Sequence, residues 1–350
     1  MERTHYSEGW ESMKIDPEVE NILHNVLEGK SLGRDDAIKL MNVDINSIEM
    51  YALMAIANSK TRKLFDNFGE VHAQIGINYA PCPNKCGFCV FSVVSKNIEL
   101  DLDEVLKRTK WFVDEGANAI FLMTTANYDF EKFVEIGRAV RKTIPPKMPL
   151  VANIGDFGNS EVKELLDAGF TAIYHVVRLR EGIDTKIDPS DRLRTIKAAK
   201  SVGLDLSYCV EPIGPEHTHE EIVDAMFRGK ELKPAIMATM RRIPVPGTAL
   251  AKFGQITQLE QAKIEAITRL VMGNDILAMG VHEAYIPCLI SGANQIYAET
   301  GPNPRDKAID TTKGRGFSVR SCRTLLQEAG FTPRDGPARS LQGPIRGGTK

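Results

Sequence analysis

The sequence predicts an α/β protein built on a complete (β/α)8 barrel, with a helical segment before the barrel and a short tail after it. Apolar residues keep helical spacing early in the chain, as Val19, Ile22, Leu23 and Val26 do. From about residue 71, short strand-like runs alternate with amphipathic stretches of helical length. Eight such strands with right-handed crossovers are typical of a closed parallel barrel, which is therefore the fold that we expect.

The order of these elements divides the chain into three parts. We expect a helical extension over residues 1–70, the barrel over residues 71–333 and a mobile tail over residues 334–350, because this last stretch is rich in Pro, Gly and Arg. An open doubly wound sheet is the competing fold, but it rarely needs eight strands in this order. The expected strands are residues 72–79, 119–125, 150–154, 172–177, 204–210, 235–240, 276–280 and 295–297. The helices expected between them include residues 103–115, 131–142, 160–168, 189–202, 219–229 and 258–272.

Composition and charge indicate an enzyme that binds neither nucleic acid nor a membrane. The formal net charge of the 350 residues is −2, which provides no attraction for a polyanion. No apolar run approaches the roughly 18 residues of a membrane span, and the N-terminus lacks the apolar core of a secretory signal. Six cysteines in such a chain favour a reducing compartment over a disulfide scaffold, so a cytoplasmic location is expected.

Three cysteines lie close together directly after the first expected strand. Cys82, Cys86 and Cys89 have the spacing C-x3-C-x2-C, and no fourth ligand is nearby in the sequence. A closed structural metal site has four protein ligands, whereas a cuboidal iron–sulfur cluster takes one thiolate on each iron. Three thiolates on four irons leave one iron free to bind another molecule. In a (β/α)8 barrel the loop after a strand is also where active sites lie.

With Phe88 just before its last cysteine, this motif resembles the signature of the radical SAM superfamily. The resemblance implies a [4Fe-4S] cluster on Cys82, Cys86 and Cys89, and S-adenosylmethionine bound to the free iron. It also implies reductive cleavage of S-adenosylmethionine to a 5′-deoxyadenosyl radical, which abstracts hydrogen from carbon. An electron donor such as ferredoxin or flavodoxin is the expected protein partner.

Two other interpretations of the cysteines stay open at this point. One is a zinc site completed by Cys209, Cys288 or Cys322, and the other is a set of unrelated buried thiols. Zinc sites usually show a second cysteine or histidine pair, and none appears downstream. In functional terms, the alternatives to a radical SAM enzyme are a sulfur-inserting enzyme like biotin synthase and a non-catalytic factor that delivers metal or clusters.

Later segments resemble one subgroup of the superfamily. It contains biotin synthase, the FeFe-hydrogenase maturase HydE and the methylornithine synthase of pyrrolysine biosynthesis. Each segment alone is a weak signal, but their order and spacing together are difficult to obtain by chance. The matching segments are residues 205–216, 242–250, 290–296 and 328–333.

The subgroup implies how S-adenosylmethionine is held. Glu181, after the fourth strand, and Arg192, on the following helix, would bind its methionine end. The ligand's ammonium favours the carboxylate of Glu181, and its carboxylate favours the guanidinium of Arg192. A surface ion pair of little consequence is the alternative for these two residues. Gly214 would allow close backbone approach to the adenosine, and Phe88 would cover the adenine or shield the cluster. Residues 124–127 stand where the superfamily usually carries a Gly-Gly-Glu segment, and a Thr or Asn there would have to bind the ammonium.

The substrate is expected to be a small molecule or a cofactor precursor bound by polar residues at the strand ends. A sulfur-donating second cluster, as in biotin synthase, would need cysteines on the second, third and fifth strands, and only Cys209 is present. We therefore expect hydrogen abstraction followed by rearrangement, cleavage or methylation. No catalytic residue is assigned, and the alternative for the two adjacent arginines is that one is solvated and the other forms a structural ion pair. The candidate substrate residues are Asn153, Tyr208, Arg241, Arg242 and His282, with Thr125, Asn127, Glu211 and Glu283 as further strand-end candidates.

Overall fold

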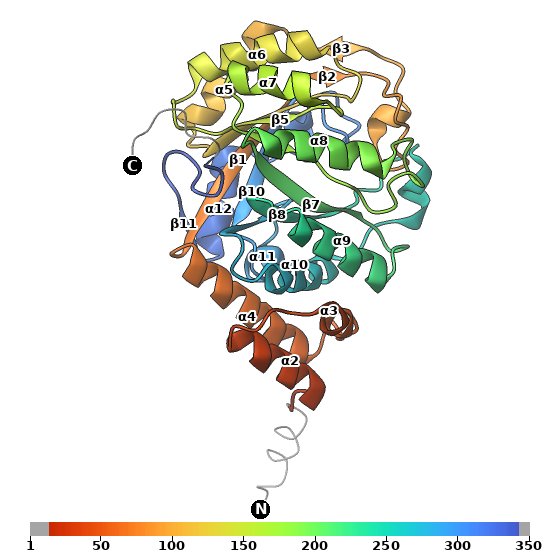
Figure 1. Cartoon of the computed structure of the whole chain (residues 1–350), viewed down its shortest axis with the longest axis vertical. Coiled ribbons are helices and arrows are strands. Elements are labelled where there is room, and N and C mark those ends of the chain that lie inside the picture. Colours follow the sequence, from red (N-terminus) through yellow and green to blue (C-terminus); the bar gives the residue numbers. More distant parts are fainter. Residues whose placement is uncertain (1–13, 343–350) are drawn as a thin grey trace, which may run out of the picture.

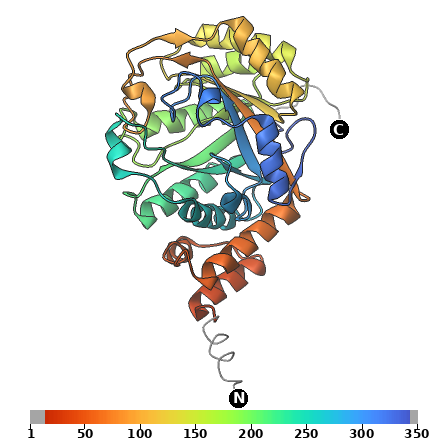
Figure 2. The same ribbon diagram turned by 180° about the vertical axis from the view of Figure 1, so that it is seen from behind.

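The computed structural model describes residues 14–342 and shows a barrel with helices around it and a group of helices at one end (Figure 1). That group consists of α2 (Pro17–Leu27), α3 (Arg34–Met41) and α4 (Ile48–Leu64), and it lies at the same end in the reverse view (Figure 2). α4 packs on α10 (Gln258–Met272), and the buried Lys263 of α10 donates hydrogen bonds to the carbonyls of Met41 and Val43. These lysine bonds satisfy carbonyls at the C-terminal end of α3.

The barrel consists of parallel strands, as the sequence predicts. Each strand pairs with its neighbour in chain order, and β10 pairs with β1 from Glu70↔Gln295 to Ile75↔Thr300, which closes the sheet. The prediction of a complete (β/α)8 barrel is therefore confirmed. The strands are β1 (Phe68–Gly76), β4 (Ala119–Met123), β5 (Leu150–Asn153), β6 (Ala172–Tyr174), β7 (Asp205–Ile213), β8 (Ile236–Arg241), β9 (Ala278–Val281) and β10 (Gln295–Thr300).

The helices that cover the strands begin where the sequence supplies a capping side chain. Asp101, Asp129 and Asp188 each accept a backbone hydrogen bond at a helix start, and Thr218 and Thr257 form capping boxes with the glutamates three residues later. The helices that follow the strands are α5 (Leu102–Asp114), α6 (Phe130–Thr143), α7 (Asn159–Ala168), α8 (Pro189–Ser201), α9 (His219–Glu231), α10, α11 (Ile286–Leu289) and α12 (Val319–Glu328). The shorter elements are β2 (Asn78–Tyr79), η1 (Val90–Ser92), β3 (Ile98–Glu99), η2 (Ala249–Phe253), η3 (Thr311–Lys313) and β11 (Thr332–Pro333).

The C-terminal segment is ordered beyond the point where the sequence predicts a mobile tail. The expected tail starts at residue 334, but residues 334–342 pack against the amino-terminal end of the barrel. Ala338 donates its backbone N–H to the Asn118 carbonyl at 2.8 Å, the Ser340 hydroxyl donates to Glu70, and Leu341 is buried. Composition alone misses this packing because it rests on two apolar side chains and one buried carboxylate. The rest of the predicted tail, residues 343–350, lies outside the described residues.

None of the helices within residues 14–342 has the length and apolar composition that crossing a bilayer requires.

Candidate active site

The carboxyl ends of the barrel strands surround a cavity of about 140 Å³. All eight strands contribute to its wall, either through a strand residue or through the loop that follows. Because the strands are parallel, side chains far apart in the sequence meet here. One contributor from each strand or its following loop is Gln74, Met123, Asn153, Tyr174, Glu211, Met240, His282 and Arg305.

The loop after β1 brings Cys82, Cys86 and Cys89 onto this wall. Backbone hydrogen bonds tie the loop to its neighbours, since Gly87 donates to the Asp184 carbonyl at 2.8 Å and Val90 donates to the Pro304 carbonyl at 2.9 Å. Behind the loop, a small apolar cluster packs together, with the rings of Tyr79 and Phe91 edge to face at 5.7 Å. The loop is therefore held by several parts of the barrel and does not depend on its own short sequence. The cluster consists of Tyr79, Val90, Phe91 and Val245.

The cysteine loop fits an iron–sulfur cluster better than a single metal ion. Among residues 14–342, no three His, Cys, Asp or Glu side chains converge as the ligands of one ion would. A cuboidal cluster instead takes each thiolate on a different iron, so its ligands stand further apart. Burial raises the pKa of Cys86 to about 11 and raises that of Cys89 as well. These thiols therefore require a positive centre, such as iron, to exist as thiolates.

Buried charged residues lie beside the cysteines. The Glu181 carboxylate is 3.7 Å from Nε of Arg192 and 3.7 Å from Nη1 of Arg178, and both Glu181 and Arg192 are buried. The charges of Arg178, Glu181 and Arg192 all act on the pKa of the Cys86 thiol, which places them near the loop. A surface ion pair, the alternative interpretation of Glu181 and Arg192, is thus wrong. Nε of Arg192 is buried and has no hydrogen-bond partner in the described part of the chain.

Arg192 also belongs to a triad that the sequence analysis missed. Asp156 Oδ1 accepts hydrogen bonds from His175 Nε2 at 2.8 Å and from Arg192 Nη1 at 3.2 Å. Burial lowers the pKa of His175 to about 4, so its ring is neutral at neutral pH. Burial opposes ionisation of Asp156, but the His175 hydrogen bond and the Arg192 charge hold its pKa at about 2. The triad fixes the direction of the Arg192 side chain. No local sequence motif predicts this triad.

Several other predicted residues line the cavity. Phe88 lies on the wall, with Arg178 Cζ 5.9 Å from the centre of its ring. Asn153 and His282 are also on the wall. Arg242 lines the cavity too, but Nη2 of its guanidinium donates to Glu216 Oε2 at 2.8 Å, which agrees with the ion-pair alternative for this residue.

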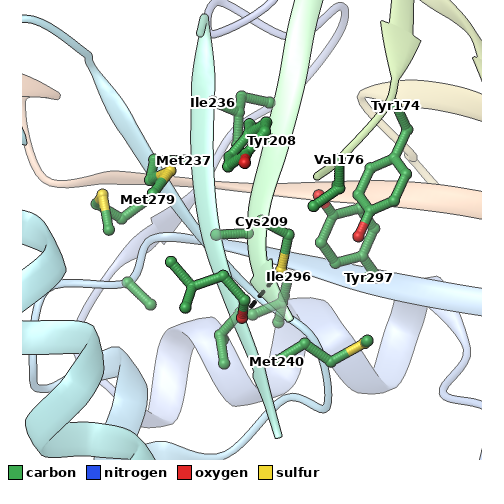
Figure 3. Close-up of a cluster of buried hydrophobic side chains, with 14 of the residues drawn as sticks. Tyr174, Val176, Tyr208, Cys209, Ile236, Met237, Met240, Met279, Ile296 and Tyr297 are labelled. Atoms are coloured by element: carbon green, nitrogen blue, oxygen red, sulfur yellow. Dashed lines mark hydrogen bonds between the residues drawn. The ribbon is translucent and has the colours of Figure 1, made fainter. Parts of the chain in front are cut away.

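Several predicted residues lie off the wall, among them Glu181, Tyr208, Arg241 and Gly214. Tyr208 packs between β7 and α9. A Cβ atom built on Gly229 of α9 would be only 3.0 Å from the Tyr208 ring, so the ring lies directly against this helix. In Figure 3 Tyr208 lies apart from Tyr174 and Tyr297. Arg241 points toward the Ile256 carbonyl and the ring of Tyr285. A Cβ at Gly214 would be 2.4 Å from Arg242 Nη1, so this glycine makes room for a side chain of the protein itself.

The errors at Tyr208 and Arg241 have one physical cause. Successive side chains of a strand point to opposite faces of the sheet. Met240 and Arg242 line the cavity, and Arg241 between them therefore faces the helix layer. A strand assignment from sequence places a residue near the correct strand end without deciding its face.

Comparisons with known proteins agree with this geometry. The model of the radical SAM superfamily matches residues 80–228, a segment that contains the three cysteines, Glu181 and Arg192. Residues 80–228 of this chain are a radical SAM domain. The [4Fe-4S] cluster and S-adenosylmethionine of this superfamily are accordingly the cofactors of the chain.

Relatives of this radical SAM protein include two biotin synthases. The biotin synthase of Saccharopolyspora erythraea is 26% identical over 77% of this chain and 79% of its own length. That of Renibacterium salmoninarum is 24% identical over 91% of this chain and 95% of its own length. Among solved structures, methylornithine synthase PylB matches with a TM-score of 0.77 and 18% identity, covering 91% of this chain and 98% of PylB. The FeFe-hydrogenase maturase HydG from Carboxydothermus hydrogenoformans matches with a TM-score of 0.78 and 16% identity, covering 93% of this chain and 81% of HydG. At such identities the structural matches show the shared fold.

Proposed function

We propose that this radical SAM enzyme abstracts hydrogen from a carbon atom of a small molecule or cofactor precursor bound inside its barrel. The single observation that carries the proposal is that the three cysteines, the buried Arg192 and the polar strand ends all line one cavity. When bound, the cluster and S-adenosylmethionine supply a 5′-deoxyadenosyl radical. The side chains of the cavity bind, orient and shield the reactants.

Arg192 and Glu181 are proposed to hold the methionine end of S-adenosylmethionine. The free Nε–H of Arg192 is available to a carboxylate, and the Asp156–His175 pair keeps the guanidinium in place. Glu181 already accepts a hydrogen bond from Thr185 at 2.8 Å, which orients its carboxylate. Thr124, at the position expected of a Gly-Gly-Glu segment, lines the cavity, and its hydroxyl is buried without a hydrogen-bond partner in residues 14–342. This hydroxyl is a suitable acceptor for the ligand's ammonium.

Apolar side chains around the polar groups protect a radical reaction from water. Phe88, Phe91, Met123, Ile154 and Met240 all line the cavity. Excluding water prevents quenching of a reactive intermediate and strengthens the electrostatic contacts inside the site.

The positions of the remaining cysteines argue against sulfur insertion, although the curated relatives are named biotin synthase. Cys209 on β7 lies near Tyr174, at the interior side of the barrel (Figure 3). Cys288 is on α11 and Cys322 is on α12, where its thiol donates to the Tyr297 carbonyl at 3.5 Å. One interior cysteine does not provide the ligands of a second cluster. We therefore propose a product without sulfur derived from the protein.

Anaerobic reconstitution tests the proposed function. The wild-type protein should bind about four irons per chain. With S-adenosylmethionine and either dithionite or reduced flavodoxin or ferredoxin, it should form 5′-deoxyadenosine. Deuterium on the substrate carbon should move into 5′-deoxyadenosine, and mass spectrometry should show no added sulfur in the product. Bound zinc without cleavage would instead support a metal-delivery role, and about six irons would support a second cluster.

A further inference from the structure

The wall of the cavity contributed by β9 and β10 carries two polar side chains that the proposed function does not yet use. His282 follows β9, and Arg305 lies in the loop after β10. Both line the cavity, and both side chains are more than nine-tenths buried. Within residues 14–342, Nη1 of Arg305 and both ring nitrogens of His282 have no hydrogen-bond partner. Buried polar groups in folded proteins are normally paired, so these three atoms indicate a ligand.

Arg305 is held rigidly by its other contacts. Its Nη2 donates to Glu299 Oε1 at 2.7 Å, and its backbone N–H donates to Asn303 Oδ1 at 3.0 Å. Glu299 in turn accepts from Arg315 at 2.7 Å and from Gln74 at 3.2 Å. The Nη1 group stands 3.9 Å from Glu283 Oε1, too far for a hydrogen bond. One donor of the guanidinium is thus fixed in direction and left unused.

His282 is held by aromatic contacts, which leave its nitrogens unbound. Its ring stacks on Tyr297 with centroids 3.8 Å apart, and Tyr174 meets it edge to face at 5.8 Å. Burial, and then the charge of Arg305, lower the pKa of His282 well below its ordinary value. A neutral imidazole carries one N–H donor and one acceptor nitrogen. The donor is therefore available beside the Arg305 guanidinium.

We propose that Arg305 and His282 form a subsite that binds a carboxylate of the substrate, one oxygen on Arg305 Nη1 and the other on the His282 N–H. This inference rests on the proposed function, because it names the class of molecule that the barrel takes. A singly charged, planar carboxylate matches two donors from two side chains. A phosphate dianion fits less well, because Glu299 already neutralises Arg305 and Glu283 lies nearby. The substrate class is accordingly a small carboxylic acid.

The test uses the reconstituted holoenzyme with S-adenosylmethionine and ligand-detected saturation-transfer NMR. The probes are formate, acetate and the twenty common amino acids, with acetamide, the amino-acid methyl esters and inorganic phosphate as comparisons. Free carboxylates should bind, and the esters, acetamide and phosphate should not. In Arg305→Gln and His282→Phe, binding of the best carboxylate should weaken about tenfold or more, since each loses a donor to a charged group. His282→Phe keeps the stacking surface on Tyr297.

Arg241→Gln is the matched control, because Arg241 is as buried as Arg305 but lies off the cavity wall. It should bind the carboxylate as the wild type does. Equal binding of phosphate, unchanged binding in both subsite variants, or no carboxylate signal from any probe would overturn the subsite. Formation of 5′-deoxyadenosine without added substrate should persist in both subsite variants. If the wild type itself forms none, the proposed function fails, which is a different result from loss of the subsite.

Discussion

The two ends of the barrel differ in whether the protein itself supplies hydrogen-bond partners to its buried charged and polar side chains. At the amino-terminal end, Glu70 is fully buried and accepts hydrogen bonds from His72 Nε2 at 3.1 Å, from the Ser340 hydroxyl and from the Arg339 backbone. At the carboxyl end, Arg305 and His282 are also buried but keep unused nitrogens facing the cavity. A buried polar group whose hydrogen-bond partners come from the protein stabilises the fold. A buried polar group without such a partner is available to bind a ligand. The first end should therefore control stability, and the second should control binding and chemistry.

The largest effect is expected at the cysteine loop. Replacing Cys82, Cys86 or Cys89 by Ala removes one of three cluster ligands, so each variant should lose the brown chromophore and all cleavage of S-adenosylmethionine. Cys209→Ala should keep both, because Cys209 lies on β7, away from the loop. Iron analysis and chromatography of 5′-deoxyadenosine provide the measurements. A colourless single variant that still cleaves S-adenosylmethionine would contradict the three-thiolate assignment.

A smaller effect is expected at the group around Arg192. Glu181→Gln and Arg192→Ala should each weaken S-adenosylmethionine binding about tenfold to a hundredfold, because a hydrogen bond to a charged group contributes about 1.5–3 kcal/mol. Cluster content should not change. Arg194→Ala is the control, since Arg194 lies two residues further along α8 with its side chain exposed. Equal binding in all variants, measured by equilibrium dialysis, would exclude this site for S-adenosylmethionine.

A substitution at the amino-terminal end of the barrel should change stability without changing the reaction. Ser340→Ala removes one donor from the buried Glu70 carboxylate and should lower the free energy of unfolding by about 1–3 kcal/mol. The rate of 5′-deoxyadenosine formation should stay at the wild-type value. Urea unfolding and the cleavage assay are measured on the same preparation. A change in cleavage rate with unchanged stability would reverse the proposed division between the two ends.

A further expected effect is a dependence of stability on pH. The pKa of His175 is lowered to about 4 by burial, from an ordinary value of 6.5. Between these values the unfolded chain binds a proton that the folded protein does not, so the free energy of unfolding falls as pH decreases from 6.5 toward 4. The contribution of Asp156, whose pKa is about 2, is lost only at lower pH. His175→Gln should flatten the curve by up to about 1.4 kcal/mol per pH unit. Parallel curves for the two proteins would contradict the assignment.

The sequence by itself determined the order of the strands and helices and supplied the candidate cluster ligands. Both signals are local, because strand and helix periods repeat within a few residues and Cys82, Cys86 and Cys89 lie within eight residues. Glu181 and Arg192 followed from resemblance to a family, and the structure places both beside the cysteine loop.

Only the tertiary structure decided which side chains meet in the cavity and which face each strand-end residue takes. Arg305, Asp156 and His175 come from three different loops and become neighbours of the site only when the parallel strands close into a barrel. Tyr208 and Arg241 were placed on the correct strands but on the wrong face, because a difference of one residue reverses the direction of a side chain. Residues 334–342 were misjudged from composition, since the partner that orders them is Glu70, about 270 residues earlier in the chain. Contacts over such distances depend on the closed barrel and leave no local pattern in the sequence.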